Sequence, residues 1–225
     1  MISYNLTEKM ENSMSFYDEF NNNQYGSQTK VVELVGAGKK VLEIGCASGR
    51  ISKRLTENGC KVVGVEIDAN SSIKAKNFCH EVVTCDIESL EDLDYHDNYF
   101  DVILFSNVLE HLKSPLNVLK KLKRYLKSDG YIVVAVPNIA NIIIRIKLLM
   151  GKFEYEDSGI LDRTHLRFFN EKNAKDLLYQ AGFNIIKFDI VPFIPVLTIN
   201  PKIEYKVAKI RPNLFSAEFL IVGKK

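Results

Sequence analysis

The sequence contains few residues that could stabilise a fold through disulfide bonds or a structural metal ion. Its 225 residues include 4 cysteines and no tryptophan, and the cysteines form no CxxC pair. No histidine lies at metal-ligand spacing from Cys46, Cys60, Cys79 or Cys85, so a zinc-finger type of site is excluded. We therefore expect four reduced thiols in a cytoplasmic protein.

An excess of charge of one sign is also lacking. The 30 basic and 28 acidic residues leave a net charge of +2, which gives no global attraction to nucleic acid or to an anionic membrane. Apolar stretches such as IANIII at 139–144 are far below the roughly 20 residues of a membrane span. The first residues, MISYNLTEKMENS, have no apolar core of a signal peptide. We expect neither a nucleic-acid partner nor a membrane span.

Short β-rich runs alternate with helical patterns through the first two thirds of the chain. Strands are predicted at residues 39–45, 61–68, 81–87, 100–108 and 131–137. Helices are predicted at residues 49–59, 71–79 and 114–127, the last with Ser114 as N-cap and Pro115 at N1. The alternation predicts βαβ units and an α/β fold with a doubly wound, mostly parallel sheet. A hydrophobic content of 46% is enough for one core, so a single domain over 1–225 is expected.

The end of the chain has a different pattern. Residues 183–193 and 217–225 are both strand-like, and no helical pattern is evident between them. They are predicted to pair as an antiparallel hairpin at the edge of the sheet.

Glycines and acids follow three of the predicted strands. LEIGCASGR places Gly45 and Gly49 after the first strand, where the chain must turn tightly and the backbone can approach a ligand. Glu66 ends the second strand and can accept hydrogen bonds from two ribose hydroxyls. Asp86 ends the third strand beside Ile87, a pair that can bind an adenine amine and cover its face. A surface charge at Glu66 and a capped turn at Asp86 are the plain alternatives, but three such features at successive strand ends favour a nucleotide-type site.

The glycine spacing indicates the cofactor. The pattern Glu43-x-Gly45-x-x-x-Gly49 differs from the G-x-G-x-x-G of dinucleotide sites and resembles motif I of the class I S-adenosylmethionine-dependent methyltransferases. The resemblance implies S-adenosylmethionine as cofactor and a seven-stranded Rossmann-like sheet with an antiparallel last strand. It implies these cofactor-binding residues: Glu43, Gly45, Cys46, Gly49, Glu66, Ile67, Asp86, Ile87 and Asn107. Position 66 holds Glu where many members have Asp, and Cys46 is interpreted as a small residue packed against the cofactor.

An insertion at 138–169 follows the fifth strand and ends in the string LDRTHLRFF. Ile142, Ile146, Leu149 and Met150 can form one face of a helix lying over the strand ends. A further helix is predicted from near Asn170 to a stop at Gly182. The string resembles a subgroup of small methyltransferases related to ubiquinone-biosynthesis methylases, and this implies that the insertion contributes to an acceptor pocket.

The string carries the groups that an acid–base reaction needs. His165 is the first candidate for a general base toward a hydroxyl acceptor, with Asp162 to orient it. Arg163 and Arg167 could hold a carboxylate or phosphate of the acceptor. The alternative is an Asp162–Arg163 structural ion pair, with His165 capping the next helix.

His111, in LEHL after the fourth strand, is the second candidate base. The alternative is a histidine at a helix start, bonded to the backbone. Glu110 beside it is interpreted as a helix-terminus charge, and no metal is expected.

The family resemblance implies that the first 30 residues form a lid over the cofactor, with Tyr17 as a substrate-binding residue and Tyr25 as a further lid residue. A plain packing helix is the alternative. The oligomeric state is left open, a homodimer included.

These residues predict methyl transfer to a small-molecule acceptor, most simply O-methylation of a sugar, a glycan or lipid, or a natural-product intermediate. N-methylation of an amino-sugar or similar amine, and a non-catalytic S-adenosylmethionine-binding subunit, are the alternatives. A nicotinamide-dependent oxidoreductase is suggested only by Tyr205-x-x-x-Lys209, which lies outside any clear helical pattern. A nucleic-acid methyltransferase would show an (N/D/S)PP(Y/F/W) loop, where this chain has SNVLEH.

Overall fold

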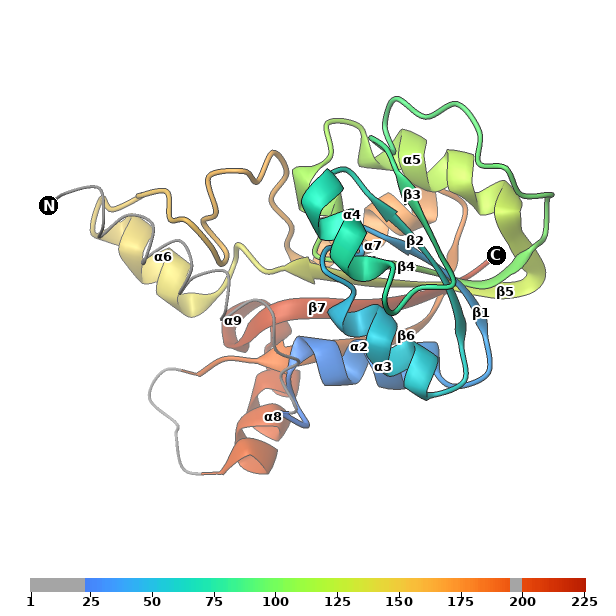
Figure 1. The fold of residues 1–225 in the computed structure, drawn as a ribbon. Coiled ribbons are helices and arrows are strands. Elements are labelled where there is room, and N and C mark those ends of the chain that lie inside the picture. Colours follow the sequence, from blue (N-terminus) through green and yellow to red (C-terminus); the bar gives the residue numbers. More distant parts are fainter. Residues whose placement is uncertain (1–22, 195–199) are drawn as a thin grey trace, which may run out of the picture.

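The computed structural model describes residues 23–194 and 200–225, and these contain one seven-stranded sheet of order β3-β2-β1-β4-β5-β7-β6 (Figure 1). The first five strands run parallel, and β7 is antiparallel to both of its neighbours. The predicted fold class is therefore confirmed. The strands are β1 (Lys40–Ile44), β2 (Lys61–Glu66), β3 (Glu81–Thr84), β4 (Phe100–Ser106), β5 (Leu126–Pro137), β6 (Asn184–Pro192) and β7 (Ser216–Lys224).

The helices connect these strands and have local causes that the sequence shows. Asn170 caps α7 through a reciprocal capping box with Asn173, and Gly182, at φ +80°, follows its end. Pro115 begins α5 as predicted, but the Ser114 side chain makes no capping hydrogen bond. The helices are α2 (Ser27–Val35), α3 (Arg50–Glu57), α4 (Ala69–Ala75), α5 (Pro115–Leu122), α6 (Ile142–Leu149), α7 (Glu171–Gln180), α8 (Pro201–Ile210) and α9 (Pro212–Phe215), with 3-10 turns η1 (Leu109–His111) and η2 (Lys123–Tyr125).

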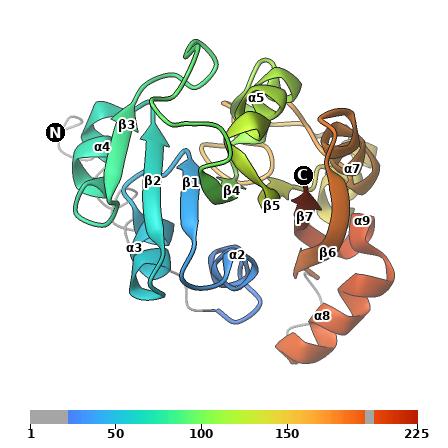
Figure 2. The same cartoon turned by 90° about the vertical axis from the view of Figure 1, so that its right-hand side faces the viewer.

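Helices cover both faces of the sheet, which explains the continuous apolar strands. Leu42 and Ile44 of β1 belong to the core that includes α5 and α7, whereas Val41 belongs to the core that includes α2 and α3. Figure 2 shows α5 on one side of the sheet and α2 and α3 on the other. Because side chains alternate along a strand, Glu43 shares the face of Val41 and so is directed toward α3.

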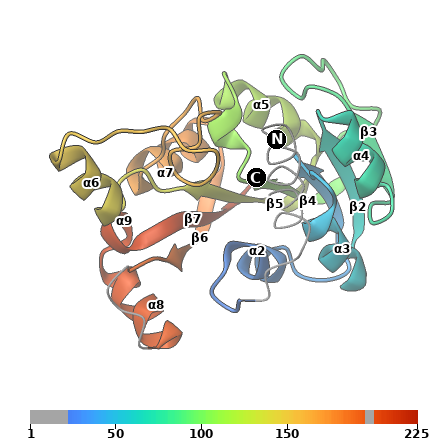
Figure 3. The same cartoon turned by 60° about the vertical axis from the view of Figure 1, so that its left-hand side comes forward.

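Two expectations from the sequence are wrong in part. The strands β6 and β7 do pair antiparallel, as predicted. However, α8 and α9 lie between them in the chain, and β7 lies inside the sheet between β5 and β6, so the two strands do not form a simple hairpin at the edge. The insertion helix α6 forms, yet its predicted apolar face is largely exposed: Ile146 at 45%, Leu149 at 88% and Met150 at 58%. It lies at the end of the molecule remote from β3 and α4 (Figure 3).

Asp189 of β6 joins three elements. Its carboxylate accepts a hydrogen bond from Lys30 of α2 at 2.8 Å and another from the Tyr205 hydroxyl of α8. Burial alone would raise the pKa of Asp189, but the hydrogen bonds from Lys30 and Tyr205 outweigh it and hold that pKa below its ordinary value. Tyr25 packs against Tyr205, with ring centroids 5.1 Å apart, and so belongs to this network; its role in a lid stays a prediction. Tyr17 lies outside the described residues.

Replacing Asp189 should show how much its negative charge contributes to stability. We expect Asp189→Asn to lower the free energy of unfolding near pH 7 by about 3 kcal/mol, because it leaves the Lys30 ammonium buried without a counter-charge. The folded-state pKa is depressed, so the stabilisation is present above the unfolded pKa and is lost as pH falls through the folded one. Urea unfolding should therefore show that the difference in the free energy of unfolding between the original chain and Asp189→Asn is smaller at strongly acid pH than at neutral pH. The exposed Asp176→Asn serves as control, and equal losses in the two variants would contradict the prediction.

Candidate active site

The turn after β1 is built around two glycines that no other residue can replace without strain. Gly45 has φ +70°, and a Cβ there would lie 2.5 Å from Cγ2 of Val108 in the turn after β4. Gly49 has φ +85°, and a Cβ there would lie 3.0 Å from both Cα of Ala75 and the ring of Phe78. Both glycines are required by close packing within the protein, a cause that the sequence interpretation, which invoked the cofactor, had not included.

Glu66 is fixed at the carboxyl end of β2. One carboxylate oxygen accepts a hydrogen bond from the Ala47 amide at 2.8 Å and the other from the Asp68 amide at 2.9 Å. A carboxylate can accept about four hydrogen bonds, so lone pairs remain for two ribose hydroxyls. The next side chain, Ile67, is 69% exposed and offers an apolar surface for an adenine face. Strand end, carboxylate and apolar surface together fit the nucleoside part of S-adenosylmethionine.

Glu43 has a supporting position. Its side chain is buried and accepts a hydrogen bond from the Ser52 hydroxyl of α3 at 2.6 Å. Burial raises the pKa of Glu43 to about 8, so the carboxyl holds a proton near neutral pH. Glu43 therefore links β1 to α3 through Ser52, and a direct contact with the cofactor stays a prediction.

Cys46 faces the sheet. A Cβ at Gly64 of β2 would lie 2.6 Å from the Cys46 sulfur and 3.2 Å from that of Cys79, so both thiols fill the space above this glycine. All four cysteines are free, and the cytoplasmic location expected from them stays a prediction.

The remaining expected cofactor residues differ in their surroundings. Asp86 is exposed and accepts a hydrogen bond from the Glu88 amide at 2.9 Å, which is the capped turn of the alternative interpretation. Ile87 is buried in the core beside α5, so Ile67 is the more accessible of the two isoleucines. Asn107 is exposed, has φ +55° and donates to Glu218 at 3.4 Å.

The LDRTHLRFF string lies against the turn after β4. The amides of Leu166 and Arg167 donate to the Glu110 carbonyl at 2.8 and 2.9 Å. Glu110 is in η1, two residues after the Val108 that packs on Gly45. The string is therefore at the same edge of the sheet as the glycine turn, as an acceptor-site role requires.

The string brings the two candidate histidines together. The rings of His111 and His165 have centroids 4.8 Å apart. His165 Nδ1 lies 3.1 Å from the Ile160 carbonyl, which can only accept, so this nitrogen carries a proton. Thr164 donates its hydroxyl proton to Asp162 at 2.6 Å, so at 3.1 Å from His111 Nδ1 it can only accept. Each neutral ring therefore keeps its lone pair on Nε2.

Asp162 and the two arginines are engaged differently from the expectation. Asp162 binds the amide and hydroxyl of Thr164, and so reaches His111 through that hydroxyl instead of contacting His165 directly. Arg163 pairs with Asp157 at 2.6 Å on the surface, so the alternative Asp162–Arg163 ion pair is not formed. Arg167 donates to the Lys113 carbonyl. An anion-binding role for either arginine stays a prediction.

Glu110 is the residue whose importance the sequence interpretation missed. It lies in the first turn of η1, as a helix-terminus charge would, but it is fully buried and neither carboxylate oxygen has a hydrogen-bond partner among the described residues. Burial raises its pKa to about 8, and the charges of Glu218 and Asp162 add to the effect. The available signal was an acid four residues after a buried strand, between Leu109 and His111.

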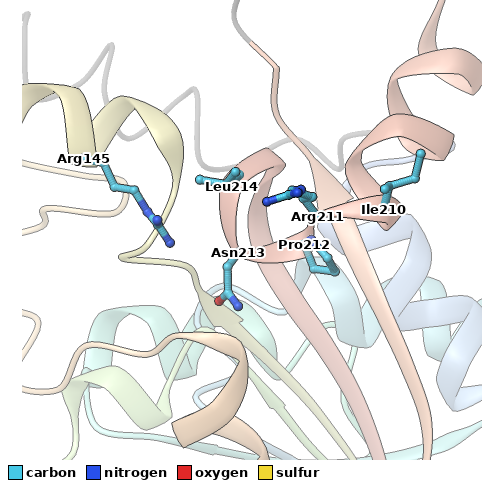
Figure 4. A pocket seen from close by; sticks show the side chains of 6 residues that line it. All are labelled: Arg145, Ile210, Arg211, Pro212, Asn213 and Leu214. Atoms are coloured by element: carbon cyan, nitrogen blue, oxygen red, sulfur yellow. The ribbon is translucent and has the colours of Figure 1, made fainter.

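A cavity of about 380 Å³ lies between α6 and α9. Arg145 reaches from α6 toward Asn213, and Arg211 lies on the opposite side (Figure 4). Two guanidinium groups suit a carboxylate or phosphate, and neither arginine had been singled out from the sequence.

Comparison with known proteins decides the family. Residues 17–187 match the family described as "Methyltransferase domain". The chain belongs to this family. A ubiquinone biosynthesis O-methyltransferase of Coxiella burnetii is 28% identical over 177 residues, which are 66% of this chain and 76% of the relative. The corresponding enzyme of Glaesserella parasuis is 29% identical over 109 residues, 45% of this chain and 46% of its own length. This methyltransferase domain thus spans about half the length of the first curated relatives it matches.

Solved structures confirm the fold of this methyltransferase domain. A SAM-dependent methyltransferase of Archaeoglobus fulgidus is 22% identical with a TM-score of 0.64, covering 88% of this chain and 92% of that one. The 1,6-didemethyltoxoflavin-N1-methyltransferase of Burkholderia thailandensis, solved with S-adenosylhomocysteine, is 16% identical with a TM-score of 0.61, covering 99% and 86%. Family and fold support the expected cofactor, S-adenosylmethionine.

The oxidoreductase alternative fails on position as well as on family. Tyr205 and Lys209 do lie on a helix, α8, contrary to the sequence interpretation. Both bind Asp189 in the network described above, which gives the motif a structural cause.

Across the described ranges, no helix has the length and apolar character to cross a membrane.

Glu66 provides the first test of the cofactor site. We expect Glu66→Ala to weaken S-adenosylmethionine binding by about 1–3 kcal/mol, because two ribose hydroxyls lose a charged acceptor. Isothermal titration calorimetry measures this, with circular dichroism to verify folding. Glu57→Ala, at an exposed glutamate of α3, is the control and should leave the affinity unchanged. An unaltered affinity in Glu66→Ala would remove this residue from the site.

Glu43 provides a test of its burial. Its folded pKa of about 8 exceeds the ordinary 4.5, so the folded state binds more protons and loses stability as pH rises between these values. Glutamine cannot ionise and can still accept from Ser52. We expect Glu43→Gln to raise the free energy of unfolding relative to the original chain at about pH 8, with a smaller gain at about pH 5. Urea unfolding at both pH values measures the difference; a gain independent of pH would refute the protonated, buried state.

Proposed function

We propose that this chain transfers a methyl group from S-adenosylmethionine to a hydroxyl of a small-molecule acceptor. The observation that carries the proposal is the pairing of His111 with His165 at the edge where Val108 packs on Gly45. Two Nε2 lone pairs beside the expected methyl-transfer point suit a hydroxyl, which must lose a proton to become a nucleophile. A neutral amine is already a nucleophile, so an amine acceptor has less need of a proton-accepting histidine pair than a hydroxyl has.

The residues of this chain would divide the work by position. Glu66 and Ile67 bind the nucleoside end of the cofactor, and the Gly45 turn admits its methionine end. S-adenosylmethionine, when bound, supplies an electrophilic methyl group on a sulfonium. The acceptor oxygen forms its bond to the methyl carbon as the carbon–sulfur bond breaks, and the bonding pair stays on sulfur. The hydroxyl proton leaves at the histidine pair. Alignment by the surrounding walls reduces the entropic part of the barrier.

The acceptor is proposed as a sugar, a glycan or lipid, or a natural-product intermediate. The O-methyltransferase names of the Coxiella burnetii and Glaesserella parasuis relatives support oxygen as the acceptor atom. N-methylation of an amino-sugar or similar amine remains the second candidate, supported by the N1-methyltransferase among the solved neighbours. Incubation with radiolabelled S-adenosylmethionine and matched hydroxyl and amine acceptors distinguishes the two. Transfer to amines alone would overturn the hydroxyl assignment.

The histidine pair supplies the catalytic test. We expect His165→Ala to retain S-adenosylmethionine affinity while kcat falls by about 10²–10⁴-fold, because proton removal then has no assistance. His165→Asn should be nearly as slow. Steady-state kinetics with the best hydroxyl acceptor measures the change.

His111→Ala divides the role between the two histidines, and His80→Ala, at an exposed histidine remote in sequence from both, is the control. A His165→Ala variant with near-normal kcat and a raised KM would make His165 an acceptor-binding residue.

A further inference from the structure

We propose that Glu110, His111 and His165, here called the Glu110 cluster, form a binding site for one divalent transition-metal ion. Each residue offers one ligand atom, and these atoms lie within 4.8 Å of one another. Ligand atoms around a tetrahedral Zn²⁺ with bonds of about 2.0–2.2 Å lie roughly 3–3.5 Å apart. Small side-chain rotations are therefore enough to close the cluster around an ion.

The orphaned carboxylate of Glu110 is the first independent observation. Both oxygens are buried and unpartnered among the described residues, although a buried acid is ordinarily hydrogen-bonded or paired. Among the ion pairs of the described residues, none involves Glu110, Asp162 or Glu218. Both of the last two carboxylates act electrostatically on Glu110. A cation in the cluster would satisfy both oxygens and would compensate the negative charge that Glu110 acquires when it ionises.

The orientation of both imidazoles is the second observation. His165 Nδ1 donates to the Ile160 carbonyl, and His111 Nδ1 donates to Thr164, whose hydroxyl is held by Asp162. Metal-ligating histidines characteristically use one ring nitrogen in this way, which fixes the tautomer and directs the other nitrogen at the ion. Here the Nε2 atoms are the two left free. Asp162 and Thr164 thereby become positioning residues for His111.

The donor set indicates the class of ion. Two imidazoles and one carboxylate suit Zn²⁺, Fe²⁺ or Co²⁺, whereas Mg²⁺ and Ca²⁺ prefer oxygen ligands alone. Three protein ligands leave at least one coordination position open, the arrangement of catalytic metal sites. Of the three residues only Glu110 is fully buried, and His111 is partly exposed. The open position can therefore be reached from solvent.

The ion would give the proposed reaction its proton removal, and this role, unlike the binding itself, rests on the proposed function. A divalent cation lowers the pKa of a hydroxyl brought to it, so the acceptor could lose its proton to solvent near neutral pH. The two histidines would then promote proton loss at the same place by holding the ion beside the acceptor hydroxyl, and solvent would take the proton. Chelator would abolish turnover in that case, whereas it would leave a purely imidazole-based reaction intact.

Binding is tested on the full chain after chelator treatment and without S-adenosylmethionine. Calorimetric titration with Zn²⁺ should give one ion per chain, and Glu110→Gln should weaken it by at least about 10²-fold, since loss of an outer-shell partner alone costs about 10–100-fold. Thr164→Val, a near-isosteric change at the surface, should weaken binding by that smaller factor. His80→Ala should bind as the original chain does. Mg²⁺ should bind far more weakly.

Co²⁺ provides a spectroscopic arm, because the four free cysteines are competing ligands. A visible ligand-field spectrum without a strong near-ultraviolet thiolate band is expected, and it should be lost in His165→Ala. A thiolate band, equal Zn²⁺ affinity in the original chain and Glu110→Gln, or no stoichiometric binding would each overturn the site. Calorimetry with S-adenosylmethionine is run separately: lost cofactor binding with retained Zn²⁺ binding would refute the proposed function and leave the metal site standing.

Discussion

The close contact between Gly45 and Val108 is the constraint on which the rest of the site depends. It brings the turn after β1 and the turn after β4 so near that a single Cβ would not fit between them. The first turn leads to Glu66 through the Ala47 amide, and the second continues into η1, whose Glu110 carbonyl receives the LDRTHLRFF string. The cofactor side and the acceptor side are thus placed against each other by the Gly45 backbone, which packs on the Val108 side chain, and by the backbone hydrogen bonds to the Glu110 carbonyl.

The sheet and the cofactor side could be predicted from sequence because their causes are local. Short continuous apolar runs, a helix stop such as Gly182 and an acid at the end of β2 all act within a few residues of where they stand in the chain. The placement of Gly45 and Glu66 followed from those signals together with the family resemblance. The packing cause of Gly45 did not, because Val108 is remote in sequence.

The acceptor side was less predictable for the same reason. Asp162 was expected to bind His165, three residues away. Instead, the Thr164 hydroxyl donates a hydrogen bond to Asp162 and contacts His111, so Asp162 acts on His111 through Thr164. The burial of Glu110 depends on elements that only the folded chain assembles around η1. Helix α8 was missed although its start carries local signals, with Asn200 as N-cap and Pro201 at the first position; the contact of Tyr205 with Asp189 supports it further. The exposed face of α6 shows the converse: a clear periodicity does not guarantee a partner surface.

The position of β7 has a consequence for the order in which the molecule can assemble. This strand separates β5 from β6, so β6 has no neighbour in the sheet until residues 216–224 are in place. The Asn138 side chain at the end of β5 likewise binds the carbonyls of Asn213 and Ser216. β1 and β2 pair between residues close in sequence, such as Lys40 with Lys61, whereas β5 and β7 pair between residues far apart, such as Pro137 with Glu218, and such contacts are slow to form. Folding is therefore expected to end with the closure of the sheet by β7, after β1 and β2 have paired.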